Sequence, residues 1–520
     1  MKRIVRTLCL LGLWLLAACA SPAPAGIEQP LVLVTLDPNA TATPTPFQPA
    51  PASDTAVSTP IPTETPRSTE SPTLEPSGPT AADTFTPPAP PPPVPAGSRT
   101  QYTFYVTLDY AARGVAVNET IVYANNTDQS LSTIVMAVEP NLWADCFSLS
   151  KLDEDGAAAA DYTLSGQRLT ISLPQPLGPG ATTTFSMGYS LALPLKSSEA
   201  TLGYRTNQIN LTDWYPFIVP FAGDWLLHDP STFGEHLVYD PADYDVNVNT
   251  VGPGIVLAAS APGDANGSSS HYHLDAARTF VLSASDSYLV DESAVGSTKI
   301  RAYYFAGHSD ANKAVLWMAT QSLGLYEAKF GPYPYPSLSI AEADLADGQE
   351  YDGLVFLASK FYTDYNGTAK SNLFTIGTHE IAHQWWFGLV GNDQAGEPWL
   401  DEALAVYSER IFYQYNYPNF GDWWWAFRVN YFGPQGYVDS SVYSFSTFRS
   451  YVNAVYLNGA TFLEDLRTRI GDDAFFASLQ DYAVTYARGR ATTSGFFGVV
   501  RRHTSKDFSD ILQAYFQGQY

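Results

Sequence analysis

The hydrophobic periodicity of the chain changes once, near residue 299. Between residues 99 and 298 apolar side chains alternate with polar ones, as from Tyr102 to Leu108, and turn-forming clusters separate the runs. This pattern predicts a β-rich N-terminal domain of antiparallel strands, sandwich-like or saddle-like. Over residues 299–520 most apolar residues recur at helical spacing, which predicts a mainly helical α+β domain.

The second region should contain several helices and one early strand. Residues 338–343 are typical of a strand, and Asp472 and Ser494 suit helix N-caps. The expected helices cover residues 311–326, 374–389, 398–415, 453–470, 472–486 and 494–503.

The first 19 residues have the features of a secretory signal. A basic start precedes a short apolar stretch from Leu8 to Leu16, too short to span a bilayer. The tetrapeptide Leu16-Ala17-Ala18-Cys19 resembles the bacterial lipoprotein signal, which implies a lipid on Cys19 and an extracytoplasmic, membrane-anchored protein. We expect no other membrane contact. An ordinary signal peptide that ends near a cysteine is the alternative.

Residues 20–98 are dense in Pro, Thr, Ser and Ala, which predicts a disordered linker that acts as a spacer. The whole chain has 27 Lys+Arg against 52 Asp+Glu, a formal net charge of -25. Because such a surface repels phosphate backbones, we expect no nucleic-acid partner.

The motif that carries chemistry is His379-Glu380-Ile381-Ala382-His383. Two histidines four residues apart leave the same face of a helix and reach one metal ion. Glu402 follows on the next expected helix and completes a set of two histidines and one glutamate. Such a set leaves the fourth tetrahedral position for water, which predicts one catalytic zinc ion per chain with Glu380 as the base.

The sequence around these predicted ligands resembles that of the aminopeptidase N family of gluzincins, metallopeptidase family M1. The resemblance rests on His383-Gln384-Trp385, on the stretch from Trp399 to Ala405 and on Tyr333-Pro334-Tyr335-Pro336. It departs from the family at Ala403, where a glycine is usual. The resemblance implies a thermolysin-like catalytic domain, here without the large C-terminal helical domain of longer relatives.

The resemblance also implies further site residues. Tyr456, in the segment that ends in Gly459-Ala460, matches the family's transition-state tyrosine, with Tyr443 and Tyr451 as nearby alternatives. Glu350 matches the glutamate that holds the substrate's free amine, although its neighbours differ from the family motif. A second amine-binding residue is expected from the β domain, and Gln208 is the nearest candidate.

These observations predict a zinc aminopeptidase that acts on peptide substrates. A zinc endopeptidase of the same fold is one alternative, and a catalytically silent binding module is another. The run Trp423-Trp424-Trp425 is interpreted as packing or as a pocket wall.

Overall fold

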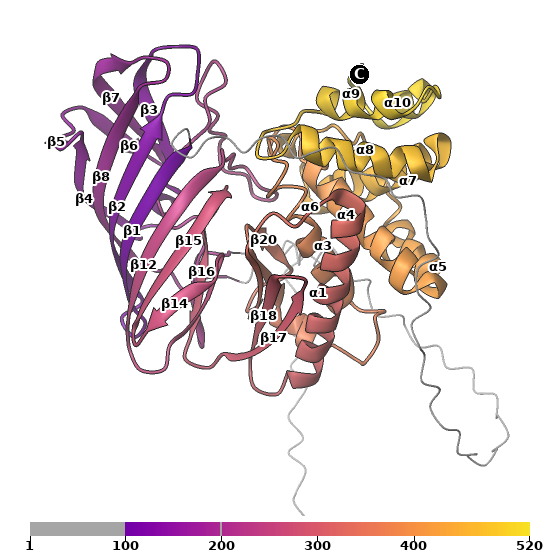
Figure 1. Ribbon diagram of the computed structural model, residues 1–520, viewed down its shortest axis with the longest axis horizontal. Coiled ribbons are helices and arrows are strands. Elements are labelled where there is room, and N and C mark those ends of the chain that lie inside the picture. The colour runs from indigo at the N-terminus through magenta and orange to yellow at the C-terminus, as the bar shows by residue number, and fades with distance from the viewer. Residues whose placement is uncertain (1–98, 198–199) are drawn as a thin grey trace, which may run out of the picture. The chain divides into compact units, whose positions relative to one another are not determined.

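The computed structural model describes residues 99–197 and 200–520, and up to residue 285 its regular elements are nearly all β-strands (Figure 1). Alternating burial along these strands follows the alternating sequence, as the pattern of the first region predicts. The strands are β1 (Thr100–Asp109), β2 (Gly114–Ala124), β3 (Leu131–Ala137), β4 (Phe147–Glu154), β5 (Ala157–Ala158), β6 (Tyr162–Ser165), β7 (Arg168–Leu177), β8 (Thr182–Ala192), β9 (Gly203–Arg205), β10 (Gln208–Leu211), β11 (Phe217–Ile218), β12 (Ala242–Val251), β13 (Val256–Ala259), β14 (Gly263–Asn266), β15 (Ser269–Ala277) and β16 (Leu282–Ser285).

Within the described residues these strands form three sheets, in the orders β14-β15-β12-β1-β2-β8-β4-β5, β13-β16-β10-β9 and β11-β3-β7-β6. The β-rich prediction is confirmed, but the pairing is not purely antiparallel. Strand β1 pairs with β12 in parallel, from Thr100 opposite Ala242 to Asp109 opposite Val251. Periodicity shows which face of a strand is buried but not the direction of its neighbour, so the sequence pattern did not reveal this pair.

The second region combines one mixed sheet with helices. The sheet has the order β17-β18-β19-β21-β20, so β17 and β20 are its edge strands. The predicted domain boundary at residue 299 falls inside its first hairpin, because the alternation of β17 resembles that of the strands before it. The strands are β17 (Leu289–Val295), β18 (Thr298–Tyr304), β19 (Ser337–Ala343), β20 (Gln349–Tyr351) and β21 (Leu354–Ala358).

Helices make up most of the chain after β21, and α1 lies beside β17 and β18 (Figure 1). They are α1 (Ser309–Phe330), α2 (Ser359–Thr363), α3 (Asn372–Ala382), α4 (Trp399–Asn416), α5 (Gly421–Trp424), α6 (Phe448–Val452), α7 (Asn458–Ile470), α8 (Asp472–Thr485), α9 (Thr493–His503) and α10 (Ser509–Tyr515). The expected N-caps are wrong. Asp472 is the first residue of α8 rather than its cap, and the Thr492 side chain caps α9 in place of Ser494.

Helix α3 ends earlier than the predicted range of 374–389. His383 is its C-cap, and Phe387 has a φ of 136°, which an α-helix excludes. The backbone then folds back on the helix end, where Gly388 N–H donates to His383 O at 2.9 Å. This turn leads the chain to α4. The C-terminal end of α3 and the N-terminal end of α4 therefore lie close together.

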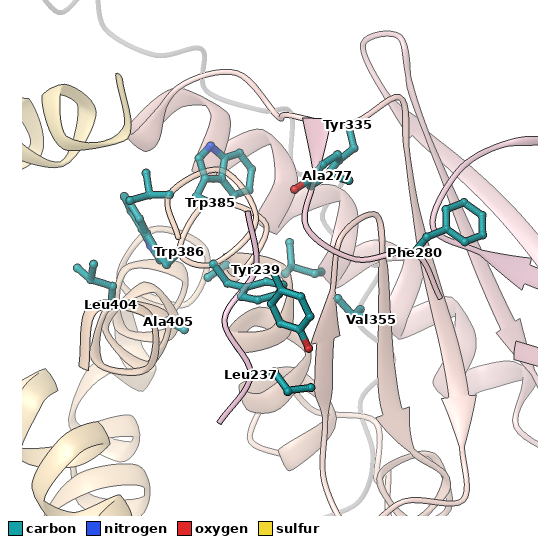
Figure 2. Close-up of a cluster of buried hydrophobic side chains, with 14 of the residues drawn as sticks. Leu237, Tyr239, Ala277, Phe280, Tyr335, Val355, Trp385, Trp386, Leu404 and Ala405 are labelled. Atoms are coloured by element: carbon teal, nitrogen blue, oxygen red, sulfur yellow. The ribbon is translucent and has the colours of Figure 1, made fainter. Parts of the chain in front are cut away.

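The β region and the helical region share one hydrophobic core. Figure 2 shows Leu237 and Tyr239, from the segment before β12, in the same buried cluster as Trp385 and Trp386 after α3. Buried Arg278 adds polar links, because its guanidinium donates to Tyr239 O, Phe387 O and Gly489 O at 2.5–2.8 Å. The turn after α3 is therefore packed against both regions.

None of the helices within residues 99–197 and 200–520 is long and apolar enough to cross a membrane. Cys19, the residue predicted to carry a lipid, lies outside the described residues.

Candidate metal centre

Three predicted ligands meet where α3 and α4 face each other. The Nε2 atoms of His379 and His383 lie 3.1 Å apart. The Oε2 atom of Glu402, in the first turn of α4, is 3.3 Å from His379 Nε2 and 3.6 Å from His383 Nε2. All three side chains are buried.

Hydrogen bonds on the far side of each imidazole orient its Nε2 atom toward this point. His383 Nδ1 donates to the carbonyl of Trp386 at 2.9 Å, and because a carbonyl only accepts, Nδ1 carries the proton. His379 Nδ1 donates to Glu409 Oε1 at 3.0 Å. Such partners of the second nitrogen are typical of metal-ligating histidines.

The electrostatics of the three side chains favour a positive charge between them. Burial lowers the pKa of His383 to about 4, which keeps it neutral. Burial also lowers the pKa of His379, but hydrogen bonds to Glu402 and Glu409 outweigh it and raise the pKa to about 10. A site that binds a proton this strongly also suits a cation, and two nitrogens with one carboxylate oxygen fit a tetrahedral zinc ion with one open position.

Glu380, the predicted base, lies beside these ligands with its Oε2 atom buried and without a hydrogen-bond partner among the described residues. Burial raises the pKa of Glu380 well above its usual value, and the neighbouring His379 offsets this only in part. Gly348 packs against the side chain so closely that a β-carbon there would overlap Glu380 Oε1. The backbone before β20 thus limits where the carboxyl group can lie.

A family model agrees with this geometry. The model described as the peptidase family M1 domain matches residues 316–515, which include every residue of the metal centre named above. The chain contains a peptidase family M1 domain. The sequence resemblance to this family is thereby confirmed.

Curated relatives match part of this chain. Aminopeptidase M1-B of Oryza sativa subsp. japonica is 24% identical over 245 residues, which are 44% of this chain and 28% of the relative. Aminopeptidase N of Streptomyces lividans is 23% identical over 229 residues, 41% of this chain and 26% of the relative. The matched stretch thus spans little more than a quarter of these relatives.

Solved structures show the same fold over a larger share of the chain. The M1 zinc metallopeptidase from Deinococcus radiodurans aligns with a TM-score of 0.57 at 18% identity, covering 80% of this chain and 93% of the other. A two-domain M1 zinc metallopeptidase mutant bound to L-tryptophan aligns with a TM-score of 0.60 at 17% identity, covering 81% and 95%. The order of a β-rich region before a helical M1 domain is therefore that of known two-domain structures.

Tyr456 lies next to the ligands of the M1 domain. Its ring stacks on His379 with centroids 6.2 Å apart and an interplanar angle of 7°. Burial, and next the negative charge of Glu402, raise its pKa well above the usual value, so the phenol keeps its proton. The ring of Tyr451 packs edge-on against that of Tyr456, with ring centroids 5.4 Å apart. Tyr443, by contrast, is exposed, and its hydroxyl group donates to Asp229 O, away from the metal centre.

Glu350, on edge strand β20, also faces the metal centre. Its carboxylate lies within 4.8 Å of ligand atoms of Glu380 and His383, and likewise of Glu235 and Glu402. Burial, then the charges of Glu235 and Glu402, raise the pKa of Glu350 well above its usual value.

Glu235 is the site residue that the sequence analysis missed. The side-chain amide of Gln349 donates to Glu350 Oε2 at 2.8 Å and to Glu235 Oε1 at 3.5 Å, so one amide lies between the two carboxylates. Burial and the charge of Glu402 raise the pKa of Glu235 to about 7. The candidate Gln208 was wrong, because its amide is buried elsewhere and donates to Ser283, Tyr288 and Glu342 O.

The segment between β11 and β12 brings Glu235 to the metal centre. Phe233 stacks on Tyr451 with ring centroids 5.8 Å apart. Gly234 has a φ of +71°, and a β-carbon there would lie 2.9 Å from Val442 Cγ1 and 3.1 Å from the Tyr451 ring. Only a glycine meets both conditions without strain, and this close packing places the next residue, Glu235, beside Glu350.

Proposed function

We propose that the protein is a zinc aminopeptidase, which removes residues from the free N-termini of peptides. The observation that carries this proposal is the convergence of His379 Nε2, His383 Nε2 and Glu402 Oε2 in one buried place, with ligand atoms within 4.8 Å of one another. Membership of the M1 family and the aminopeptidase relatives support the same assignment.

The chain's residues would hold one zinc ion through His379, His383 and Glu402. When bound, zinc supplies Lewis-acid polarisation of the scissile carbonyl and of the attacking water. Glu380 takes a proton from that water and delivers it to the nitrogen of the leaving amine. A carboxyl group whose pKa is raised by burial suits both directions of this transfer.

Tyr456 donates a hydrogen bond to the carbonyl oxygen as negative charge develops on it. The raised pKa keeps the phenol neutral and able to donate, and its burial excludes competing water. Its ring is held between His379 and Tyr451, which fixes the direction of the hydroxyl group.

Glu350 and Glu235 recognise the ammonium group of the substrate. Their carboxylates lie together beside Glu402, and the repulsion that raises their pKa values is relieved when a cation enters. An ammonium ion at this place sets the distance from the peptide's N-terminus to the metal, so that the first peptide bond is the one cleaved.

Paired substrates test the aminopeptidase assignment. Each aminoacyl chromogenic substrate is assayed with a free and with an N-acetylated amine, for wild type and for Glu350→Gln. We expect the carboxylate to contribute about 2–5 kcal/mol of discrimination, lost in the variant mainly on free-amine substrates. Glu292→Gln is the control, because Glu292 is an exposed glutamate paired with Arg301. Equal cleavage of both substrate forms by wild type would establish the endopeptidase alternative instead.

We also propose that Cys19 is lipidated and anchors the protein to the cell membrane, outside the cytoplasm. The tetrapeptide Leu16-Ala17-Ala18-Cys19 supports this. Intact mass of the mature N-terminus should show acyl chains on Cys19. A mature N-terminus elsewhere, with activity in the culture medium, would mean plain secretion.

A further inference from the structure

Glu409 lies at the centre of a buried network behind the metal centre. Its side chain is fully buried on α4, and both carboxylate oxygens accept hydrogen bonds. Oε1 accepts from His379 Nδ1 at 3.0 Å and from Arg428 Nη2 at 2.7 Å. Oε2 accepts from Arg428 Nε at 2.8 Å and from the indole of Trp424 at 3.1 Å.

We propose that Trp424 and Arg428 are positioning residues for the metal centre. They hold the Glu409 carboxylate in the one orientation in which it accepts from His379 Nδ1, and so fix the imidazole with Nε2 toward the metal. The inference rests on the proposed function in one respect, that His379 is a zinc ligand. It adds the segment from α5 to residue 429 to the parts of the chain that determine zinc affinity.

The local backbone explains how these side chains reach Glu409. Trp424 ends α5, and Arg428 lies in the π-helical turn Trp425–Val429 that follows directly. Single π-turns re-aim side chains and are frequent at functional sites. Of the three consecutive tryptophans only Trp424 is buried, and its indole N–H faces the carboxylate. The run is therefore not uniform packing, because one member donates to the network.

The chemistry of the two donors is specific. A guanidinium group binds a carboxylate through two parallel N–H donors, which a lysine ammonium does not reproduce. The indole N–H supplies a third donor, from a second direction. Together they hold the carboxylate from two directions, and this carboxylate in turn accepts the hydrogen bond that orients His379.

The two histidines should differ in how far their orientation depends on Trp424 and Arg428. His383 Nδ1 donates to the Trp386 carbonyl, which the backbone fixes without any charged group. His379 Nδ1 depends on a side chain that Trp424 and Arg428 hold. Loss of these donors should therefore loosen one metal ligand and leave the other two in place, which weakens binding without abolishing it.

Zinc affinity of the purified full-length protein is the test, measured by competition with a chromophoric chelator for wild type, Trp424→Phe and Arg428→Lys. We expect zinc binding to weaken by up to about 10- to 100-fold, which is the usual loss when the direct partner of a metal-ligating histidine is removed. The visible spectrum of the Co²⁺-loaded protein should change in both variants. At saturating zinc, the ratio of free-amine to blocked-amine cleavage should equal that of wild type.

Two matched controls separate positioning from general stability. Trp214→Phe removes a buried indole donor to Phe280 O at 3.0 Å in the β region, and Arg467→Lys breaks a bidentate pair with Asp472. Both should lower the thermal stability of the metal-free protein and leave zinc affinity unchanged.

If Trp424→Phe and Arg428→Lys lose stability as the controls do but bind zinc as wild type does, the network is only structural and the proposal fails. If Arg428→Lys does not fold, the milder Trp424→Phe decides by the same measurement. Absence of zinc binding by wild type would instead refute the proposed function.

Discussion

Gly459 of α7 packs directly against Ala403 of α4, so closely that a β-carbon on Gly459 would overlap the methyl group of Ala403. Ala403 follows the ligand Glu402, and Gly459 comes three residues after Tyr456. The contact between these two small residues therefore sets the separation between a metal ligand and the proposed oxyanion donor. Its consequence is that neither position tolerates a larger side chain without moving one helix.

Gly459→Ala should separate α7 from α4 and lower both stability and turnover. We expect a loss of about 1–3 kcal/mol in the free energy of unfolding, the usual cost of overpacking a close contact. Turnover should fall because Tyr456 moves away from the substrate carbonyl. The control is Gly498→Ala on α9, where a β-carbon meets open space and should not destabilise. Denaturant unfolding and kcat distinguish the two; equal behaviour of both variants would contradict the role given to this contact.

Tyr456→Phe should lower kcat by about 100- to 1,000-fold, the usual loss for one oxyanion-hole donor. KM should change little, because the hydroxyl group acts mainly in the transition state. Steady-state kinetics on an aminoacyl substrate give both numbers. Tyr451→Phe is the matched variant and should retain most of kcat. If Tyr451→Phe lost kcat and Tyr456→Phe retained it, the donor role would belong to Tyr451.

Glu380→Gln should keep the metal and lose nearly all turnover, because the three ligands stay while the base is removed. Metal analysis before and after dialysis against a chelator, together with kcat, checks both halves of this statement. Gly348→Ala should give a milder version of the same result, since the atoms nearest to a β-carbon there all belong to the Glu380 side chain, which it would displace. Loss of the metal from either variant would show that these residues support the ligands instead.

Glu119, in the β region, should make the free energy of unfolding depend on pH. It is buried on β2, and the hydroxyl group of buried Tyr189 lies beside its carboxylate and offsets only part of the effect of burial on its pKa. Burial raises its pKa well above the usual value, so the folded protein holds a proton here that the unfolded chain releases above about pH 4.5.

The free energy of unfolding should therefore fall by about 1.4 kcal/mol per pH unit as pH rises from about 4.5 toward the folded-state pKa of Glu119. Glu119→Gln should remove this contribution and be more stable than wild type at neutral pH. Denaturant unfolding at several pH values is the measurement. Parallel pH profiles for the two proteins would show that Glu119 is not the titrating group.

Local spacing was enough to predict which residues meet at the candidate metal centre. His379, His383 and Glu402 lie close in sequence on two consecutive helices, so a helical period and one turn bring them together. Glu235 could not be found in this way. It comes from the β region, 114 residues before its neighbour Gln349, and no periodic pattern links the two.

The details that the sequence missed share a physical cause. The early end of α3 depends on the turn at Phe387, and the parallel pairing of β1 with β12 depends on the whole sheet. Both are decided by contacts between distant segments, which outweigh local propensity. The glycine at 234 could be read as a turn residue from sequence, but its contact with Tyr451 could not.

The parallel pair β1–β12 also has a mechanical consequence. Strand β1 begins at Thr100 and lies inside the eight-stranded order rather than at its edge, between β12 and β2. A pulling force applied to the chain ahead of Thr100 acts along this strand, so its bonds to both neighbours are loaded together in shear. They would have to break together rather than one after another. Under the proposed anchoring through Cys19, the protein would thus resist tension at β1.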